Sequence, residues 1–294
     1  MAAFFCGIDQ PFYEEESFMK RFSFLFALIV LIFGATGCSS SSSSAQEEKK
    51  TITIGATAGP YSDQIREAIQ PYLEKKGYKV KLIEFNDYVQ PNIALDQKEI
   101  DANVFQNQMY LENFAKTHQM KLQPLISIPT VPIGLYSKKH TSLDDIRDGT
   151  TIALPNEPVN QARALTMLQQ LGLLELKKDV EPTKASEKDI AKFHKNIILK
   201  PLDPAQLPRA LGDVDYALIN GNFALSSGLK LTEAVALEKT PDYYLIVVTI
   251  RPEDKDKPFV KDLIAAYKSK EFAKLIKEDP KYKGYVWPDW FQKQ

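Results

Sequence analysis

Residues 51–85 read TITIGATAGPYSDQIREAIQPYLEKKGYKVKLIEF, and their pattern decides the fold. Apolar and polar residues alternate over 51–56, which predicts a strand that ends at a glycine. A second apolar stretch at 78–85 predicts another strand. Between them, residues 62–76 carry apolar side chains at helical spacing, and Gly77 ends the pattern. Strand, helix and strand within about 35 residues form a βαβ unit, which implies parallel pairing of the two strands.

Pro71 lies inside the predicted helix and is expected to kink it, because proline lacks the N–H of a helical hydrogen bond. The alternation of the two element types continues along the chain and predicts an α/β protein. Further strands are predicted at 131–136, 151–154, 197–199, 216–219 and 245–250. Further helices are predicted at 91–97, 107–118, 160–171, 186–193, 205–211, 222–227, 258–267 and 271–277.

Two places look like crossings between lobes. Two prolines keep residues 128–132 extended, and residues 237–244 pass through Pro241 into the last long apolar strand. We therefore expect residues 51–130 plus 240–294 to form lobe 1 and residues 131–239 to form lobe 2. Two βαβ-type lobes joined by two extended crossings enclose a cleft, where ligands commonly bind.

The N-terminal part predicts an address outside the cytoplasm. Residues 19–37 comprise a basic start, twelve mostly apolar residues and small residues before Cys38, as in a secretory signal peptide. Small residues followed by cysteine are similar to a lipobox, so Cys38 is expected to carry a lipid and the folded part to sit at the cell envelope. The alternative is an uncleaved anchor in which the cysteine is incidental.

Residues 1–18 do not fit a signal peptide, because they place four acidic side chains before the basic segment. We interpret them as a misplaced gene start and Met19 as the first residue. Residues 38–50 contain six consecutive serines and then charged residues. Such a segment cannot bury apolar area and is expected to act as a polar tether.

Composition excludes several classes of function. The net charge of −1 gives no electrostatic basis for binding nucleic acid. Two cysteines and three histidines in the whole chain argue against a disulfide scaffold or a metal cluster. No nucleophile, metalloprotease or paired-carboxylate motif is present, so we expect neither an enzyme nor a cofactor.

A polar turn after a predicted strand is the first candidate for a ligand site. Residues 155–163 read PNEPVNQAR and open a helix, with Asn160 as the expected N-cap and Arg163 in its first turn. A guanidinium beside a helix N-terminus matches a carboxylate, such as that of an amino acid. The alternative is an ordinary capped helix with Arg163 in solvent. If the site is real, Arg163→Ala should abolish binding with little change in ligand-free stability.

Two further stretches follow strands. Residues 219–224 contain Asn220, whose amide can accept from an ammonium and donate to a carboxylate, although Asn-Gly is also a common turn. Residues 85–88 and 104–110 bring Tyr88, Phe105 and Tyr110, which could line an apolar pocket or belong to the core.

Taken together, several stretches in one order resemble the methionine-binding lipoprotein family, the substrate-binding subunits of methionine ABC importers. The resemblance spans about residues 50–292. It rests on GATAGP at 55–60, FNDYVQPN at 85–92, FQNQMYL at 105–111, IPTVPIGLYSKK at 128–139, PNEPVNQAR at 155–163, PAQLPRAL at 204–211 and INGNFA at 219–224. It implies a two-lobed periplasmic-binding-protein fold, type II-like, that closes on an amino acid.

The resemblance also implies roles for individual residues. Arg163 would bind the carboxylate, and Asn160 and Asn220 the ammonium and carboxylate groups. The side-chain pocket would be lined by Tyr88, Phe105 and Tyr110, and Cys38 would bear the lipid.

Three positions depart from the family pattern. Asn107 stands where the family usually has histidine, Val159 replaces threonine or serine, and Tyr244 stands where several members have asparagine. We count Asn107 and Tyr244 among the ligand-binding candidates. Because part of the pocket differs, an amino acid is a firmer expectation than methionine.

The resemblance therefore implies a lipid-anchored binding protein for L-methionine or a related amino acid, working as a monomer with an ABC permease and ATPase complex. A methionine-containing dipeptide or another small amino acid is the alternative ligand. A surface lipoprotein or adhesin without a transport role is the alternative of another class.

Overall fold

The structure is a computed structural model that describes residues 51–294. The expected extension 1–18, the signal peptide 19–37, and the tether 38–50 with Cys38 lie outside the described residues. Residues 51–294 belong to one compact unit. No helix within them combines the length and the hydrophobicity needed to cross a bilayer.

The predicted βαβ unit is present. Strand β1 (Thr51–Thr57) pairs in parallel with β2 (Lys79–Phe85), with Ile52 opposite Val80. The residues between them form α2 (Pro60–Gln64), a π-helical turn (Ile65–Ile69) and α3 (Gln70–Lys75).

The π-helical turn coincides with the expected irregularity at Pro71. The Gln70 N–H donates to the Ile65 carbonyl oxygen, five residues back, and the next residue is the proline. A π turn is one residue wider than an α turn. Because proline has no N–H to donate, the wider turn falls where a regular helical bond is already lost.

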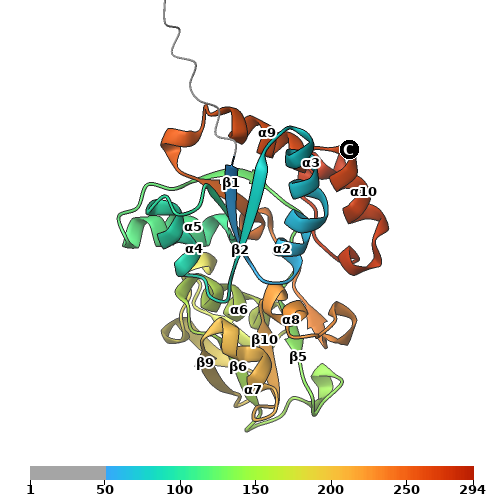
Figure 1. Cartoon of the computed structure of the whole chain (residues 1–294). Helices are drawn as coiled ribbons and strands as arrows, with labels where there is room; N and C mark the ends of the chain where they lie inside the picture. Colours follow the sequence, from blue (N-terminus) through green and yellow to red (C-terminus); the bar gives the residue numbers. More distant parts are fainter. Residues whose placement is uncertain (1–50) are drawn as a thin grey trace, which may run out of the picture. The chain divides into compact units, whose positions relative to one another are not determined.

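The first sheet has the order β2-β1-β3-β12-β4. Its strands β1 and β2 are labelled in Figure 1. Strand β3 (Ala102–Asn107) lies parallel to β1, whereas β12 (Ile246–Ile250) runs antiparallel between β3 and β4 (Gln123–Ser127). A strand from the end of the chain therefore completes a sheet built from its beginning.

The second sheet has the order β11-β5-β10-β6-β9. Its strands are β5 (Gly134–Tyr136), β6 (Thr151–Pro155), β9 (Ile198–Leu202), β10 (Tyr216–Ile219) and β11 (Ala236–Leu237). Strand β6 is parallel to both neighbours, and β5 is antiparallel to β10 and β11. The fold is α/β and two-lobed, as expected, with one sheet in each lobe.

Helices cover both sheets. They are α4 (Gln90–Asp96), α5 (Gln108–Thr117), α6 (Pro158–Gln170), α7 (Leu207–Ala210), α8 (Gly221–Ser226), α9 (Pro258–Tyr267), α10 (Lys270–Glu278) and α11 (Asp289–Gln292). Short 3-10 turns lie at Leu143–Asp145, Pro182–Lys184, Glu187–Asp189, Pro204–Gln206, Leu231–Glu233, Asp242–Tyr244, Pro252–Asp254 and Pro280–Tyr282.

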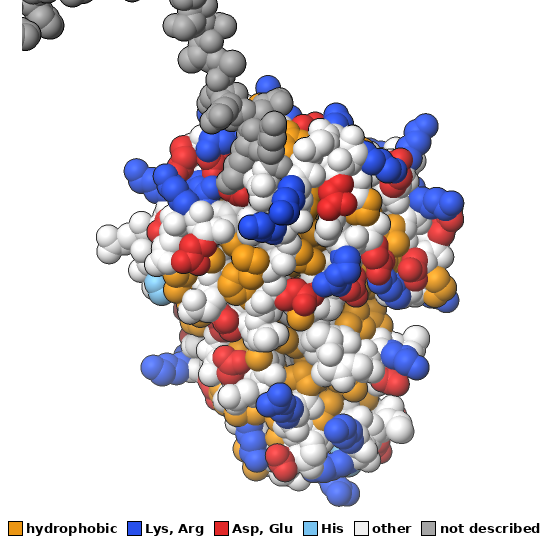
Figure 2. Space-filling model, viewed as in Figure 1, with side chains coloured by type: hydrophobic (Ala, Val, Ile, Leu, Met, Phe, Trp, Pro, Cys, Tyr) orange, Lys and Arg blue, Asp and Glu red, His pale blue; other side chains and the backbone are white. Residues whose placement is uncertain are grey.

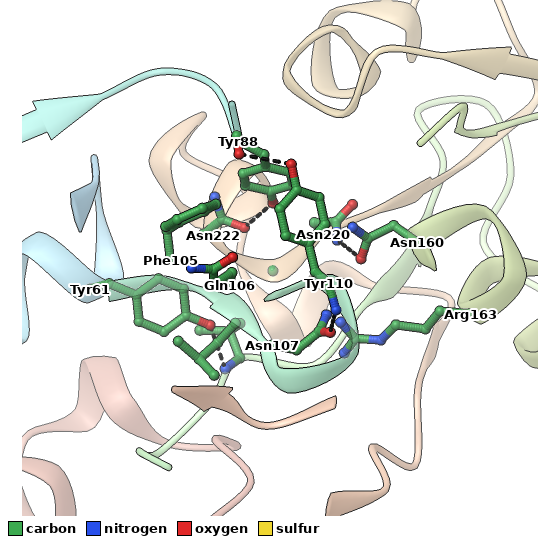
Figure 3. Close-up of a pocket in the computed structure, with 13 residues that line it drawn as sticks. Tyr61, Tyr88, Phe105, Gln106, Asn107, Tyr110, Asn160, Arg163, Asn220 and Asn222 are labelled. Carbon is green, nitrogen blue, oxygen red and sulfur yellow. Dashed lines mark hydrogen bonds between the residues drawn. The ribbon is translucent and has the colours of Figure 1, made fainter. Parts of the chain in front are cut away.

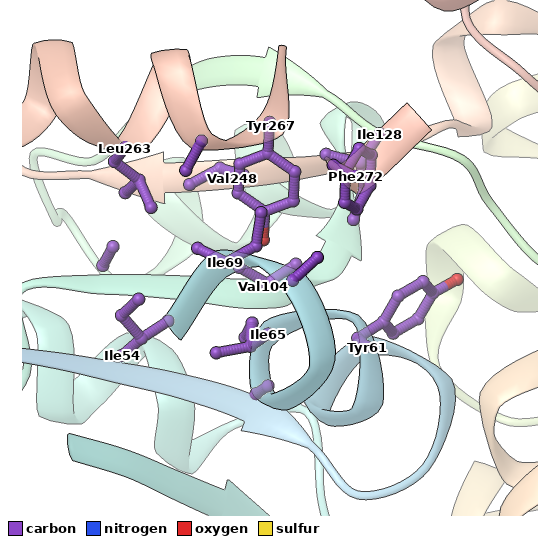
Figure 4. Packing of buried hydrophobic residues seen from close by; sticks show 14 of the residues in the cluster. Ile54, Tyr61, Ile65, Ile69, Val104, Ile128, Val248, Leu263, Tyr267 and Phe272 are labelled. Atoms are coloured by element: carbon purple, nitrogen blue, oxygen red, sulfur yellow. The ribbon is translucent and has the colours of Figure 1, made fainter. Parts of the chain in front are cut away.

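The larger core lies in the first lobe (Figure 4). Leu263 and Tyr267 of α9 and Phe272 of α10 are fully buried in one cluster with Ile69 and Val248. Helices from the end of the chain thus pack over strands from its start. This packing fixes the C-terminal segment to lobe 1.

The helix predicted at 186–193 is wrong. Residues 187–189 form a 3-10 turn, and β8 (Ile190–Phe193) pairs antiparallel with β7 (Leu174–Leu176). The reason is local: Asp189 accepts hydrogen bonds from the N–H and the hydroxyl of Ser186, which closes a tight turn in place of a longer helix.

Arg251 connects three segments at the end of β12. Its Nη1 donates to the carbonyl oxygens of Leu95 (2.6 Å) and Ile100 (2.7 Å), and its Nη2 lies 2.6 Å from a carboxylate oxygen of Asp254. Arg251 and Asp254 are both buried. A buried ion pair costs desolvation, and further hydrogen bonds such as these offset that cost.

We expect Arg251→Ala to lower the free energy of unfolding by about 3 kcal/mol, because it leaves two buried carbonyl groups without their donor and removes one of the two cations that pair with Asp254, the other being Lys257. The melting temperature should fall by at least about 6 °C. Lys255→Ala, at an exposed position four residues away, is the control and should change it little. Equal melting temperatures for the two variants would contradict this role.

Candidate functional site

One cavity lies between the two lobes (Figure 3). Segments of the first sheet and its helices contribute Tyr61, Tyr88, Phe105, Gln106, Asn107, Tyr110 and Ile246. The second lobe contributes Asn160, Arg163, Asn220, Gly221 and Asn222, and Val131 comes from the first crossing. The space not filled by atoms has a volume of about 330 Å³, part of which is open to solvent. The cavity is therefore narrow and suits a small ligand.

Except for Tyr244, every residue that we predicted to bind ligand lines this cavity. Those residues are Tyr88, Phe105, Asn107, Tyr110, Asn160, Arg163 and Asn220. The sequence analysis did not single out Tyr61, Gln106 or Ile246. Ile246 belongs to an apolar strand pattern, Gln106 lies in a strand without alternation, and Tyr61 lies next to the predicted helix, so no local signal distinguishes a wall residue from a core residue there.

The N-cap of α6 is Glu157 and not Asn160. Pro158 occupies the first helical position, where its missing N–H and fixed φ suit a helix start. The Glu157 carboxylate accepts from the N–H groups of Val159 and Asn160, both at 2.9 Å. The first free N–H groups of the helix are thereby satisfied by the protein itself.

Arg163 lies in the second turn of α6, beyond the N-terminal position that we expected. It is 4% exposed, and its guanidinium pairs with the carboxylate of Glu238. The Arg163 Nε donates to one oxygen at 2.7 Å and Nη2 donates to the other at 2.5 Å. Among the described residues no hydrogen bond uses Nη1.

The ion pair between Arg163 and Glu238 controls the charge of the site. Burial opposes the charged form of both groups, but their attraction outweighs it. The pKa of Glu238 therefore lies below its ordinary value, and the pKa of Arg163 lies above its own. Glu238 lies 75 residues further along the chain, so no sequence spacing pointed to it.

Tyr244 does not line the cavity. Its ring lies 4.8 Å from the guanidinium carbon of Arg163, a cation–π contact. The tyrosine thus packs against the ligand candidate Arg163 and does not face the enclosed space.

A chain of amides runs along the second lobe. Asn160 Nδ2 donates to Glu157 at 2.7 Å, and Asn220 Nδ2 donates to the Asn160 Oδ1 at 2.9 Å. The Oδ1 of Asn220 is buried and has no partner in the described structure. An unpaired buried acceptor is costly, and Asn220 is one of the residues that line the cavity, so this oxygen is a candidate acceptor for a ligand donor.

Tyr88 bridges the two lobes. Its hydroxyl donates to the Asn222 Oδ1 at 2.6 Å, and its ring lies 4.9 Å from that of Phe223. The Asn222 Nδ2 is a buried donor without a partner in the described structure. Burial holds the pKa of the Tyr88 hydroxyl well above its usual value, so the group stays a hydrogen-bond donor.

The remaining walls are aromatic or close-packed. The ring of Phe105 lies 5.8 Å from that of Tyr88 and 5.9 Å from that of Tyr110. Asn107 caps α5 by accepting from the Tyr110 N–H at 2.8 Å. Gly221 is required by space, since a Cβ there would lie 2.2 Å from the Val131 Cγ1.

The cavity thus offers a guanidinium N–H group and an amide N–H group as donors, and an amide oxygen as an acceptor, beside an aromatic wall. That set fits a small molecule with a carboxylate, a cationic or neutral donor and an apolar side chain. Within residues 51–294, no group of three His, Cys, Asp or Glu side chains is placed to hold a metal ion.

The chain is similar to known proteins over most of its length. The chain is 35% identical to a methionine-binding lipoprotein of Bacillus subtilis over 275 residues, covering 92% of this chain and 99% of the relative. It is 36% identical to outer membrane lipoprotein 2 of Mannheimia haemolytica over 226 residues, covering 76% and 82%.

A solved structure is also similar. A nutrient-binding protein from Burkholderia cenocepacia bound to methionine superimposes with a TM-score of 0.76 at 43% identity, covering 80% of this chain and 99% of that one. The family model described as NlpA lipoprotein matches residues 52–290. The chain belongs to the NlpA lipoprotein family.

Proposed function

We propose that the chain is an extracytoplasmic, lipid-anchored substrate-binding protein of an ABC importer that captures an amino acid, L-methionine or a close relative. The observation that carries this proposal is the set of unpaired polar groups inside the interlobe cavity. They are the buried Asn222 Nδ2 and Asn220 Oδ1, together with the Arg163 Nη1, which takes part in no hydrogen bond among the described residues. The names of the relatives, which include methionine-binding lipoproteins, support the same ligand class.

Charge favours a zwitterion. Because Glu238 already neutralises Arg163, the site has no large surplus of positive charge to attract a dianion. A carboxylate can still accept from the free Nη1 in a charge-assisted bond, with the Asn222 Nδ2 as a second donor. The Asn220 Oδ1 would then accept from the α-ammonium group.

The side chain of the ligand would lie against Tyr88, Phe105 and Tyr110. Aromatic rings attract a thioether sulfur and pack well against any apolar group. The narrow cavity favours a single amino acid over a dipeptide in this closed arrangement. Asn107 makes the pocket more amide-rich, and Tyr244 acts on the ligand only through Arg163.

Binding would work by lobe closure, with no chemistry on the ligand. We take residues 51–130 plus 240–294 and residues 131–239 as the moving bodies, joined at the two crossings. The ligand shifts the equilibrium toward the closed form only by binding it more tightly than the open form. Contacts from both lobes to one molecule supply that difference.

The closed protein would dock as a monomer on the permease of the importer, with Cys38 holding it at the membrane. The exposed face in Figure 2 supports a soluble-ligand role, because Lys and Arg alternate with Asp and Glu over it without forming a single basic stripe. A surface lipoprotein without transport activity, the alternative from the sequence, is not favoured, because it would not need the unpaired polar groups of the cavity.

Ligand binding can be tested by thermal unfolding of residues 39–294 with each L-amino acid. A ligand at a hundredfold excess over Kd should add about 2.7 kcal/mol of stability. Mass spectrometry of the denatured protein would identify any co-purified amino acid. Absence of both effects would refute the proposal.

Because Arg163 pairs with Glu238, the expectation that Arg163→Ala leaves the ligand-free stability nearly unchanged no longer applies. Removing Arg163 alone leaves Glu238 buried without its counter-charge and should cost about 3–5 kcal/mol even without ligand. The better variant is Arg163→Met combined with Glu238→Gln, which removes both charges. We expect it to fold and to lose the ligand-induced stabilisation. If it kept that stabilisation, Arg163 would not bind the ligand.

The interlobe contact of Tyr88 gives a second test. Tyr88→Phe removes the bond to Asn222 and keeps the aromatic wall, so the closed form loses one hydrogen bond. We expect calorimetry to show an affinity about 3- to 10-fold weaker. Tyr243→Phe, at an exposed tyrosine, is the control. An affinity within twofold of the wild type would show that the Tyr88 hydroxyl does not contribute to closure.

A further inference from the structure

Glu157 carries a partly buried carboxylate that makes none of the proposed contacts with the ligand. It does not line the cavity, yet one of its oxygens accepts from both the N–H and the side-chain Nδ2 of Asn160, at 2.9 and 2.7 Å. A helix cap needs only the backbone bonds. The additional bond to the amide of Asn160 connects Glu157 to the cavity.

The bonding capacity of each group fixes the orientation of two amides. An ionised carboxylate only accepts hydrogen bonds, so Asn160 must turn its Nδ2 toward Glu157. Its Oδ1 then faces Asn220, which must in turn present its own Nδ2. The atom left over is the Asn220 Oδ1, a buried acceptor in the cavity. If both amides were turned over, Asn220 would offer a donor in place of that acceptor.

We propose that Glu157 is a positioning residue that makes the cavity selective for a ligand carrying a cationic amine, by fixing the Asn160 and Asn220 amides with an oxygen toward the ligand. This inference rests on the proposed function and adds the source of ammonium selectivity. A hydrogen-bonded chain that ends in a carboxylate is also polarised, which strengthens the final acceptor.

The carboxylate end of the ligand would instead meet a donor, the guanidinium of Arg163. Glu238 holds the guanidinium of Arg163, while Glu157 acts through two amides on the Asn220 Oδ1. A donor for the carboxylate and an acceptor for the ammonium are thus each fixed by a carboxylate outside the cavity. A residue that only capped α6 would have no effect on the choice between ligands.

The test compares L-methionine with 4-(methylsulfanyl)butanoate, the same acid without its amino group. Calorimetry gives the ratio of the two dissociation constants for each variant. Glu157→Ser should keep the helix cap, because a hydroxyl accepts from the same backbone N–H groups. A hydroxyl also donates, so it no longer dictates how the Asn160 amide lies. We expect the preference for methionine to fall about tenfold or more.

Ser269→Ala provides the matched control. It removes the N-cap of α10, whose hydroxyl accepts from the Phe272 N–H, and should lower stability without changing the ratio. A ratio for Glu157→Ser within twofold of the wild type, in a protein that still binds methionine, would overturn the role of Glu157. If the wild-type protein bound neither compound nor any other amino acid, the proposed function itself would fail.

Discussion

The ion pair between Arg163 and Glu238 is the interaction on which the site depends. Glu238 also accepts from the Thr240 hydroxyl at 2.7 Å and from the Ile133 N–H at 3.4 Å, and its own N–H donates to the Ile133 carbonyl oxygen at 2.9 Å. A single residue therefore ties helix α6 to both crossings. The desolvation cost of burying two charges is offset by these additional bonds. The result is a guanidinium that is fixed in direction, with one nitrogen left for a ligand.

Fixing polar groups before the ligand arrives is a general way to gain affinity, since the cost of ordering them is met during folding. In this protein the second lobe supplies most of the fixed polar groups through Asn160, Arg163 and Asn220, each held by a carboxylate or by another amide. The first lobe supplies the rings of Tyr88, Phe105 and Tyr110. Under the proposed function, one lobe would recognise the backbone of an amino acid while the other would contact its side chain.

Much of this could be predicted from the sequence, because periodicity and turn residues are local. The βαβ unit, helix α9 and strand β10 follow directly from their patterns. Strand β3 did not, because its six residues are all buried and their sequence, ANVFQN, shows no alternation. Most of the side chains that line the cavity were predicted because they are polar or aromatic and follow predicted strands. The acceptor capacity of the Asn220 amide was predicted, but its bond to Asn160 and the ion pair of Arg163 with Glu238 were missed, because these contacts join residues 60 and 75 positions apart.

The hydrogen bonds of the crossings also locate the hinge. In lobe 1 the Ile128 N–H donates to the Ile246 carbonyl oxygen, and the Ile246 N–H donates to the Thr130 hydroxyl, both at 2.8 Å. Toward lobe 2, the Glu238 N–H donates to the Ile133 carbonyl oxygen, and the Ile133 N–H donates to the Glu238 carboxylate. In the proposed lobe closure, the bending would therefore fall within residues 131–132 and 239–245. Val131 lies in the first of these segments, and its side chain packs directly against Gly221. Tyr244 lies in the second segment, and its ring packs against the guanidinium of Arg163. Under the proposed lobe closure, bending at either segment would move a group that touches the cavity or the Arg163 guanidinium, and this would link closure to binding.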